Sequence, residues 1–125
     1  MRVAVAVWNN RISPVFDVAQ RLLVCDLEGG RVISRREEDV SGLTPQERTA
    51  RLGASGAQAL ICGAISRPMA AMVTATGVRL IPFVAGEVDE VLAAFSAGRL
   101  RGPAYLMPGC HRHRWGRRCG RGWWR

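Results

Sequence analysis

The sequence feature that most constrains the fold is a short, uninterrupted apolar run near the amino terminus. Residues Val3 to Trp8 alternate valine with alanine and end on tryptophan. A run with no polar residue at alternate positions is typical of a strand that is covered on both faces. A second short apolar run, Ala59 to Cys62, ends at Gly63. Covering both faces of a sheet requires helices on each side, so the chain is predicted to be an α/β protein.

The segments around these two runs predict a hairpin followed by helices that alternate with strands. Glu28-Gly29-Gly30 is a turn signal between two further strand patterns, and Thr44 and Ser66 are good helix N-caps. The expected elements are strands at Val3–Trp8, Arg21–Leu27, Arg31–Arg36, Ala59–Cys62 and Val78–Phe83, with helices after Thr44, after Ser66 and from about Glu87 to Gly98. The order β-β-β-α-β-α-β-α predicts a mixed sheet flanked by helices.

The charge of the chain is concentrated at its carboxyl end. Residues 1–98 contain ten arginines and ten acidic residues, whereas residues 99–125 contain eight arginines and no acid, so they supply the whole net charge of +8. We therefore divide the chain into an α/β domain over residues 1–100 and a tail over residues 101–125. The tail is rich in Arg, Gly and Trp, and it is expected to be disordered because it lacks core periodicity. Its charge indicates a polyanionic partner.

The sequence shows no export signal and no apolar run long enough to span a membrane. We therefore expect a cytoplasmic protein whose thiols stay reduced, so that its four cysteines are either buried side chains or metal ligands. Cys25 lies inside an apolar strand pattern, and Met69 and Met72 lie at helical spacing. These three residues are interpreted as core.

The tail contains a cluster of residues that can bind a metal. Cys110, His111, His113 and Cys119 bring two thiols and two imidazoles within ten residues. Thiolates and imidazoles suit zinc, iron and iron–sulfur units, although the spacing matches no standard zinc finger. The competing interpretation is an arginine-rich tail with incidental Cys and His.

A second candidate site is the turn after the fourth predicted strand, formed by Cys62, Gly63, Ala64, Ser66 and Arg67. The turn places a thiol at the carboxyl end of a strand, directly before a helix amino terminus. Backbone N–H groups and the helix dipole favour anions there, and open α/β sheets bind ligands at such strand ends. The alternative is a plain turn with a buried cysteine.

Residues 1–100 resemble the dinitrogenase iron–molybdenum cofactor biosynthesis family, which includes NifX-like domains and the carboxyl-terminal domain of NifB proteins. The order and spacing of five segments carry the resemblance: Met1–Ala6, Ser13–Ala19, Leu23–Val32, Gly56–Pro68 and Glu90–Leu100. Many relatives have a His and a Gly where this chain has Val15 and Asp17. Both histidines of this chain lie in the tail.

The resemblance implies a ribonuclease-H-like fold and a non-enzymatic role in binding or carrying an iron–sulfur or iron–molybdenum cluster. Zinc at the tail is a further option. It also implies metallocluster-assembly proteins as partners, and it leaves the oligomeric state open. A nuclease is disfavoured because the first strand carries no carboxylate for a divalent metal, and residues 1–98 contain no histidine for a catalytic set.

Two other functions remain open from the sequence. Arginines interleaved with Trp115, Trp123 and Trp124 are typical of proteins that bind single-stranded nucleic acid, because guanidinium groups contact phosphate and indoles stack on bases. The third interpretation is a small interaction domain whose tail binds an acidic protein surface.

Overall fold

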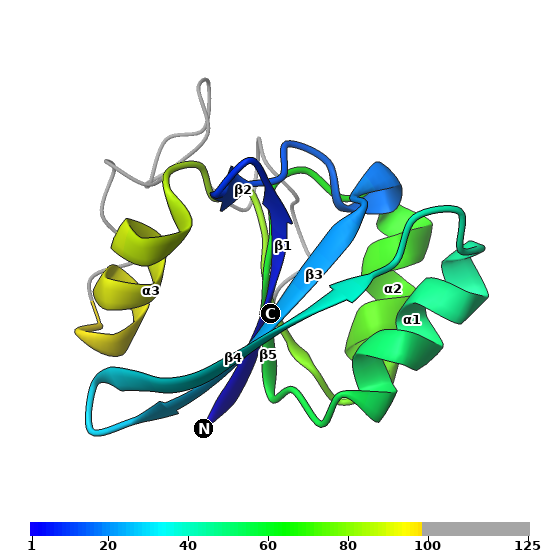
Figure 1. Ribbon diagram of the computed structural model, residues 1–125. Coiled ribbons are helices and arrows are strands. Elements are labelled where there is room, and N and C mark those ends of the chain that lie inside the picture. The colour runs from blue at the N-terminus through cyan, green and yellow to red at the C-terminus, as the bar shows by residue number, and fades with distance from the viewer. Residues whose placement is uncertain (99–125) are drawn as a thin grey trace.

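The computed structural model describes residues 1–98, which form a six-stranded mixed sheet with three α-helices and one 3₁₀ helix (Figure 1). The strands are β1 (Arg2–Trp8), β2 (Arg11–Ile12), β3 (Arg21–Glu28), β4 (Arg31–Asp39), β5 (Ala59–Ile61) and β6 (Arg79–Ile81). The helices are η1 (Phe16–Val18), α1 (Pro45–Ala54), α2 (Arg67–Ala75) and α3 (Val88–Ser96). The predicted α/β class and the predicted order of elements are confirmed.

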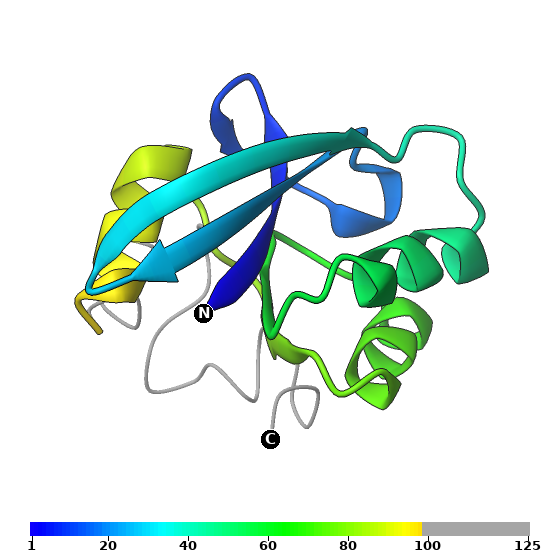
Figure 2. The same ribbon diagram turned by 60° about the horizontal axis from the view of Figure 1, so that its bottom comes forward.

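The sheet has the strand order β4-β3-β1-β5-β6, with β2 paired to the end of β1. Strands β1, β3 and β4 pair antiparallel, whereas β5 and β6 run parallel to β1. The long hairpin of β3 and β4 extends from one side of the molecule (Figure 2). The sequence did not predict β2 or η1, and the predicted strand 78–83 is shorter because regular pairing ends at Ile81.

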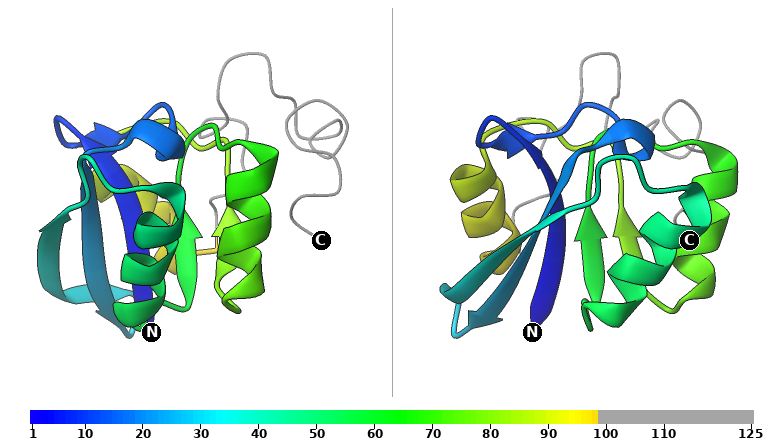
Figure 3. Two further views of the ribbon diagram at one scale, coloured as in Figure 1. Left: turned by 90° about the vertical axis from the view of Figure 1, so that its right-hand side faces the viewer. Right: turned by 45° about the vertical axis from the view of Figure 1, so that its right-hand side comes forward.

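Strand β1 lies at the centre and is buried on both faces, as its composition predicts. Ala4 and Ala6 belong to the core beneath α1 and α2, whereas Val3, Val5 and Val7 belong to the core beneath α3. Figure 3 shows the helices on opposite sides of the sheet. The smaller side chains therefore face the side with two helices, and the sheet separates two hydrophobic cores.

Two of the helices begin at the predicted caps. The Thr44 hydroxyl accepts a hydrogen bond from the backbone of Glu47, and the Glu47 carboxylate accepts one from Thr44 N–H, which completes the predicted capping box. The Ser66 hydroxyl accepts from Met69 N–H at 3.3 Å. Helix α3 has no side-chain cap at Glu87. No helix within residues 1–98 combines the length and apolar character needed to cross a membrane.

A backbone contact at Gly63 joins the loops that follow β2 and β5. Ala64 N–H donates to the Pro14 carbonyl, and Phe16 N–H donates to the Ala64 carbonyl, both at 2.8 Å. A Cβ atom on Gly63 would lie 2.5 Å from the carbonyl oxygens of both Ser13 and Pro14. Only glycine fits between these rigid backbone atoms.

We therefore expect Gly63→Ala to destabilise the full chain by about 2–3 kcal/mol, because the methyl group forces the two loops apart. Urea denaturation followed by circular dichroism measures the change. Gly53→Ala in α1 is the matched control, since a Cβ there meets nothing within 4 Å, and it should stabilise the chain by up to about 1 kcal/mol. Equal stabilities of the two variants would contradict the packing argument.

Candidate functional site

The structure places the predicted site turn, residues 62–67, between β5 and α2, at the carboxyl ends of the parallel strands (Figure 1). The loops after β1 and β6 reach the same edge of the sheet. Val84 N–H donates to the Cys62 carbonyl at 3.0 Å, and Phe83 N–H donates to the Gly63 carbonyl at 2.9 Å. The residues chosen from the sequence are thus brought together with two further loops, as ligand sites in α/β sheets are.

The thiol of Cys62 lies in the core and not on the surface of this edge. The residue is fully buried and packs in the cluster beneath α1 and α2, with Ile65 and Met69. Burial raises the pKa of the thiol far above its ordinary value, and the nearby charge of Asp17 raises it further. Metals bind the thiolate form. In this conformation Cys62 therefore has the surroundings of a structural side chain.

The amino terminus of α2 already holds an anion, the carboxylate of Asp17. One carboxylate oxygen accepts a hydrogen bond from Ser66 N–H at 2.9 Å, and the other accepts from the Ser66 hydroxyl at 2.5 Å. Pro68 has no N–H, and Met69 N–H is used by the Ser66 side chain. An anion from outside would have to compete with Asp17 for this helix end.

Arg48 of α1 places a buried positive charge beneath the same loop, and the sequence analysis did not identify it. The residue is 3% exposed, its guanidinium donates to the Ala19 carbonyl, and it lies 5.8 Å from the centre of the Phe16 ring. Its Nε is buried without a hydrogen-bond partner. Burial lowers the pKa of Arg48, whereas the charge of Asp17 raises it. The spacing of Arg48 and Leu52, four residues apart, is the signal that both occupy the inner face of α1.

The described part of the chain offers no metal centre of its own. Within residues 1–98 no group of three or more His, Cys, Asp or Glu side chains is arranged to hold a metal ion. Cys25 is buried on the other face of the sheet, and burial raises the pKa of its thiol. The four predicted tail ligands, Cys110, His111, His113 and Cys119, lie outside the described residues. Their assignment stays a prediction, as does the one for the turn at residues 62–67.

Comparison with known proteins identifies the family. Residues 1–98 match the family described as dinitrogenase iron-molybdenum cofactor. The chain belongs to this family. A search of curated protein sequences finds no significant match. The predicted family assignment is therefore confirmed by a match that spans the whole described domain and stops before the tail.

Three solved structures illustrate the relationship. A candidate NifB protein from Thermotoga shares 28% identity and a TM-score of 0.59, over 78% of this chain and 89% of that one. A candidate dinitrogenase from Methanocaldococcus jannaschii shares 19% identity and a TM-score of 0.68, over 80% and 91%. The apo form of the orange protein from Desulfovibrio gigas shares 20% identity and a TM-score of 0.67, over 84% and 94%. The last two structures share at most 20% identity with this chain, so they support its fold alone.

Because the two domain thiols are buried, we expect them to react slowly with thiol reagents. In a full chain carrying Cys110→Ser and Cys119→Ser, only Cys25 and Cys62 remain, and both are protonated and enclosed. Their reaction with a chromogenic disulfide at pH 8 should be about 100-fold slower, or more, than in the guanidinium-unfolded chain. Absorbance of the released thiolate measures both rates. Equal rates in the folded and unfolded chains would show that a thiol is open at this site.

Proposed function

We propose that this protein binds an iron–sulfur or iron–molybdenum cluster as cargo and holds or carries it without catalysing a reaction. The observation that carries the proposal is the family match over residues 1–98. The Thermotoga relative, which is described as a candidate NifB protein, also supports a role connected with this cofactor. The proposed partners are cytoplasmic proteins of cluster assembly that supply and receive the cargo.

The fold supports this assignment in two ways. The strand order β4-β3-β1-β5-β6 with helices on both faces favours the ribonuclease-H-like arrangement that the family resemblance implies. The first strand presents only apolar side chains apart from Arg2, and residues 1–98 contain no histidine. Carrier function is thus favoured over hydrolysis by a metal-dependent nuclease, which needs carboxylates around its metal ions.

We assign the ligands of the cluster to the tail and not to the domain. Both domain thiols are buried, whereas Cys110, His111, His113 and Cys119 supply the soft and borderline donors that iron prefers. In this proposal the domain meets the anionic outer surface of the cargo at the cluster edge, the exposed Arg67 beside the turn of Gly63, Ala64 and Ser66. At the amino end of α2 the cargo has to compete with the carboxylate of Asp17.

Anaerobic reconstitution with iron and sulfide tests the proposal. The wild-type chain should become coloured and bind iron. The variant Cys25→Ala/Cys62→Ala should retain that iron, whereas Cys110→Ser/Cys119→Ser should bind at least about tenfold less. Absorbance spectra and metal analysis measure the bound iron. Zinc found in the purified chain would favour a zinc site over a cluster. A colourless, metal-free wild type would end the cluster proposal, and full iron in the tail variant would end the ligand assignment.

The concentration of the net charge in residues 99–125 favours one alternative, binding of single-stranded nucleic acid through the tail. This alternative predicts affinity for an oligonucleotide that falls steeply with salt, because counterions are released on binding. It also predicts that Cys110→Ser/Cys119→Ser leaves the affinity unchanged. Fluorescence anisotropy of a labelled oligonucleotide distinguishes it from the cluster proposal.

A further inference from the structure

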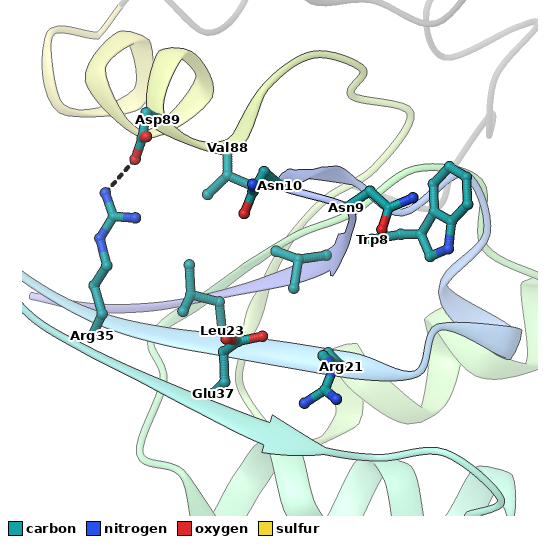
Figure 4. Close-up of a pocket in the computed structure, with 10 residues that line it drawn as sticks. Trp8, Asn9, Asn10, Arg21, Leu23, Arg35, Glu37, Val88 and Asp89 are labelled. Carbon is teal, nitrogen blue, oxygen red and sulfur yellow. Dashed lines mark hydrogen bonds and ion pairs between the residues drawn. The ribbon is translucent and has the colours of Figure 1, made fainter.

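A pocket of about 470 Å³ lies on the opposite face of the sheet from the core that contains Cys62 (Figure 4). We call it the α3 pocket, because it is bounded by the start of α3, the end of β1 and the hairpin of β3 and β4. Its volume falls within the range of small-molecule sites in proteins. The family match and the proposed cluster edge leave this pocket unexplained.

The floor of the α3 pocket is apolar and firmly packed. Val7, Leu23 and Val88 line it, and each is at most 8% exposed. Val88 N–H donates to the Asn10 carbonyl at 2.9 Å, which ties the start of α3 to the turn between β1 and β2. The turn itself consists of Asn9 and Asn10 with φ of 50° and 63°, the backbone that a two-residue hairpin requires. The floor and this wall are therefore largely formed before any ligand binds.

Four polar side chains surround this floor and are open to solvent. The side chains of Arg21, Glu37, Asn9 and Asn10 line the pocket, are exposed, and make no hydrogen bond or ion pair with the described residues 1–98. In contrast, Arg35 and Asp89 form an ion pair that closes one side of the pocket, between β4 and α3 (Figure 4). An apolar floor with a few polar groups around it is the usual composition of a small-ligand site.

Two of these side chains, Arg21 and Glu37, carry charges of opposite sign and are close enough to act on one small molecule. Glu37 lies directly opposite Leu23 in the antiparallel register, and Arg21 lies two residues from Leu23 on the same face of β3. Arg21 and Glu37 are therefore diagonal neighbours, which in such a register lie about 7–8 Å apart with their Cβ atoms somewhat closer. A ligand that carries one anionic and one cationic group on an apolar body matches this arrangement.

The charge balance of the α3 pocket excludes a polyanionic ligand. Two arginines and two carboxylates line it, so their charges cancel. Asp39 lies opposite Arg21 on β4; hydrogen bonds from Ser41 lower the pKa of Asp39, and the positive charge of Arg21 lowers it further. This additional negative charge disfavours a polyanion, whereas a zwitterion brings no net charge to the pocket. A metal–sulfur cluster or a nucleic-acid strand would find no net attraction here.

We propose that the α3 pocket binds a small zwitterion of the size of a dipeptide, with its carboxylate on Arg21, its ammonium group on Glu37 and its apolar body on Val7, Leu23 and Val88. The amides of Asn9 and Asn10 donate to and accept from the peptide group between the two charges. Arg21 binds the carboxylate through two parallel N–H groups. This site shares no lining residue with the cluster edge and lies on the face of the sheet that α3 covers.

Titration of the full chain with L-alanyl-L-leucine tests the proposal, with nuclear magnetic resonance shifts of the Leu23 and Val88 methyl groups and the Asn9 and Asn10 side-chain amides as the readout. The dipeptide should bind saturably. Its N-acetyl form, which lacks the ammonium group, and its C-amide form, which lacks the carboxylate, should each bind at least about tenfold more weakly.

Charge-removing variants assign the two contacts. Glu37→Gln should bind the dipeptide and its N-acetyl form equally, and Arg21→Gln should bind the dipeptide and its C-amide form equally. Arg36→Gln is the matched control, because Arg36 lies on β4 but outside the pocket, and it should keep the wild-type preferences. The proposal would be overturned if the dipeptide does not bind saturably at millimolar concentration. It would also be overturned if Glu37→Gln and Arg21→Gln both keep the wild-type preference for the dipeptide over its N-acetyl and C-amide forms.

Discussion

The rest of the structure depends on the burial of β1 from both faces. Its alanines face α1 and α2, its valines face α3, and every residue from Val3 to Ala6 is fully buried. This strand accepts β3 on one side and β5 on the other, so it joins the antiparallel and parallel parts of the sheet. Strand β2 turns back along the end of β1, and the loop that follows β2 meets the loop after β5, where the Gly63 backbone packs against Ser13 and Pro14. The proposed cluster edge and the α3 pocket are consequences of this central strand.

The same packing determines what the domain can offer a metal cluster. Cys25 lies in β3 and Cys62 directly follows β5. Their side chains are buried in the two hydrophobic cores, so neither thiol is exposed to bind a metal. The helix end that attracts anions is held by Asp17, and the buried charge of Arg48 lies beneath it. Residues 1–98 therefore offer no open thiol, and we propose that the donor atoms for the metals of the cargo come from the tail. The tail contains both histidines and the other two cysteines.

Local patterns predicted most of the fold, because strand burial, turn residues and helix caps act over a few neighbouring residues. Thr44 with Glu47, Ser66, and the apolar run of β1 are examples in which a local rule and the tertiary structure agree. The site was predicted less completely, because its decisive features join distant segments. Asp17 reaches Ser66 across 49 positions, and Arg48 reaches Ala19 across 29. The burial of Cys62 depends on how α2 packs over β5, and Arg21 and Glu37 become neighbours only through the register of the hairpin.

The most direct test of the account is the identity of the donor atoms around a reconstituted cluster. Since both histidines lie in the tail, a chain labelled with ¹⁵N only in histidine reports on tail ligation without any mutation. Pulsed electron paramagnetic resonance of the reduced, paramagnetic cluster should detect a ¹⁵N hyperfine coupling that becomes a ¹⁴N coupling in the unlabelled protein. A reconstituted cluster that shows no histidine nitrogen coupling, and that is lost in the Cys25→Ala/Cys62→Ala variant, would contradict the account and assign the ligands to the domain.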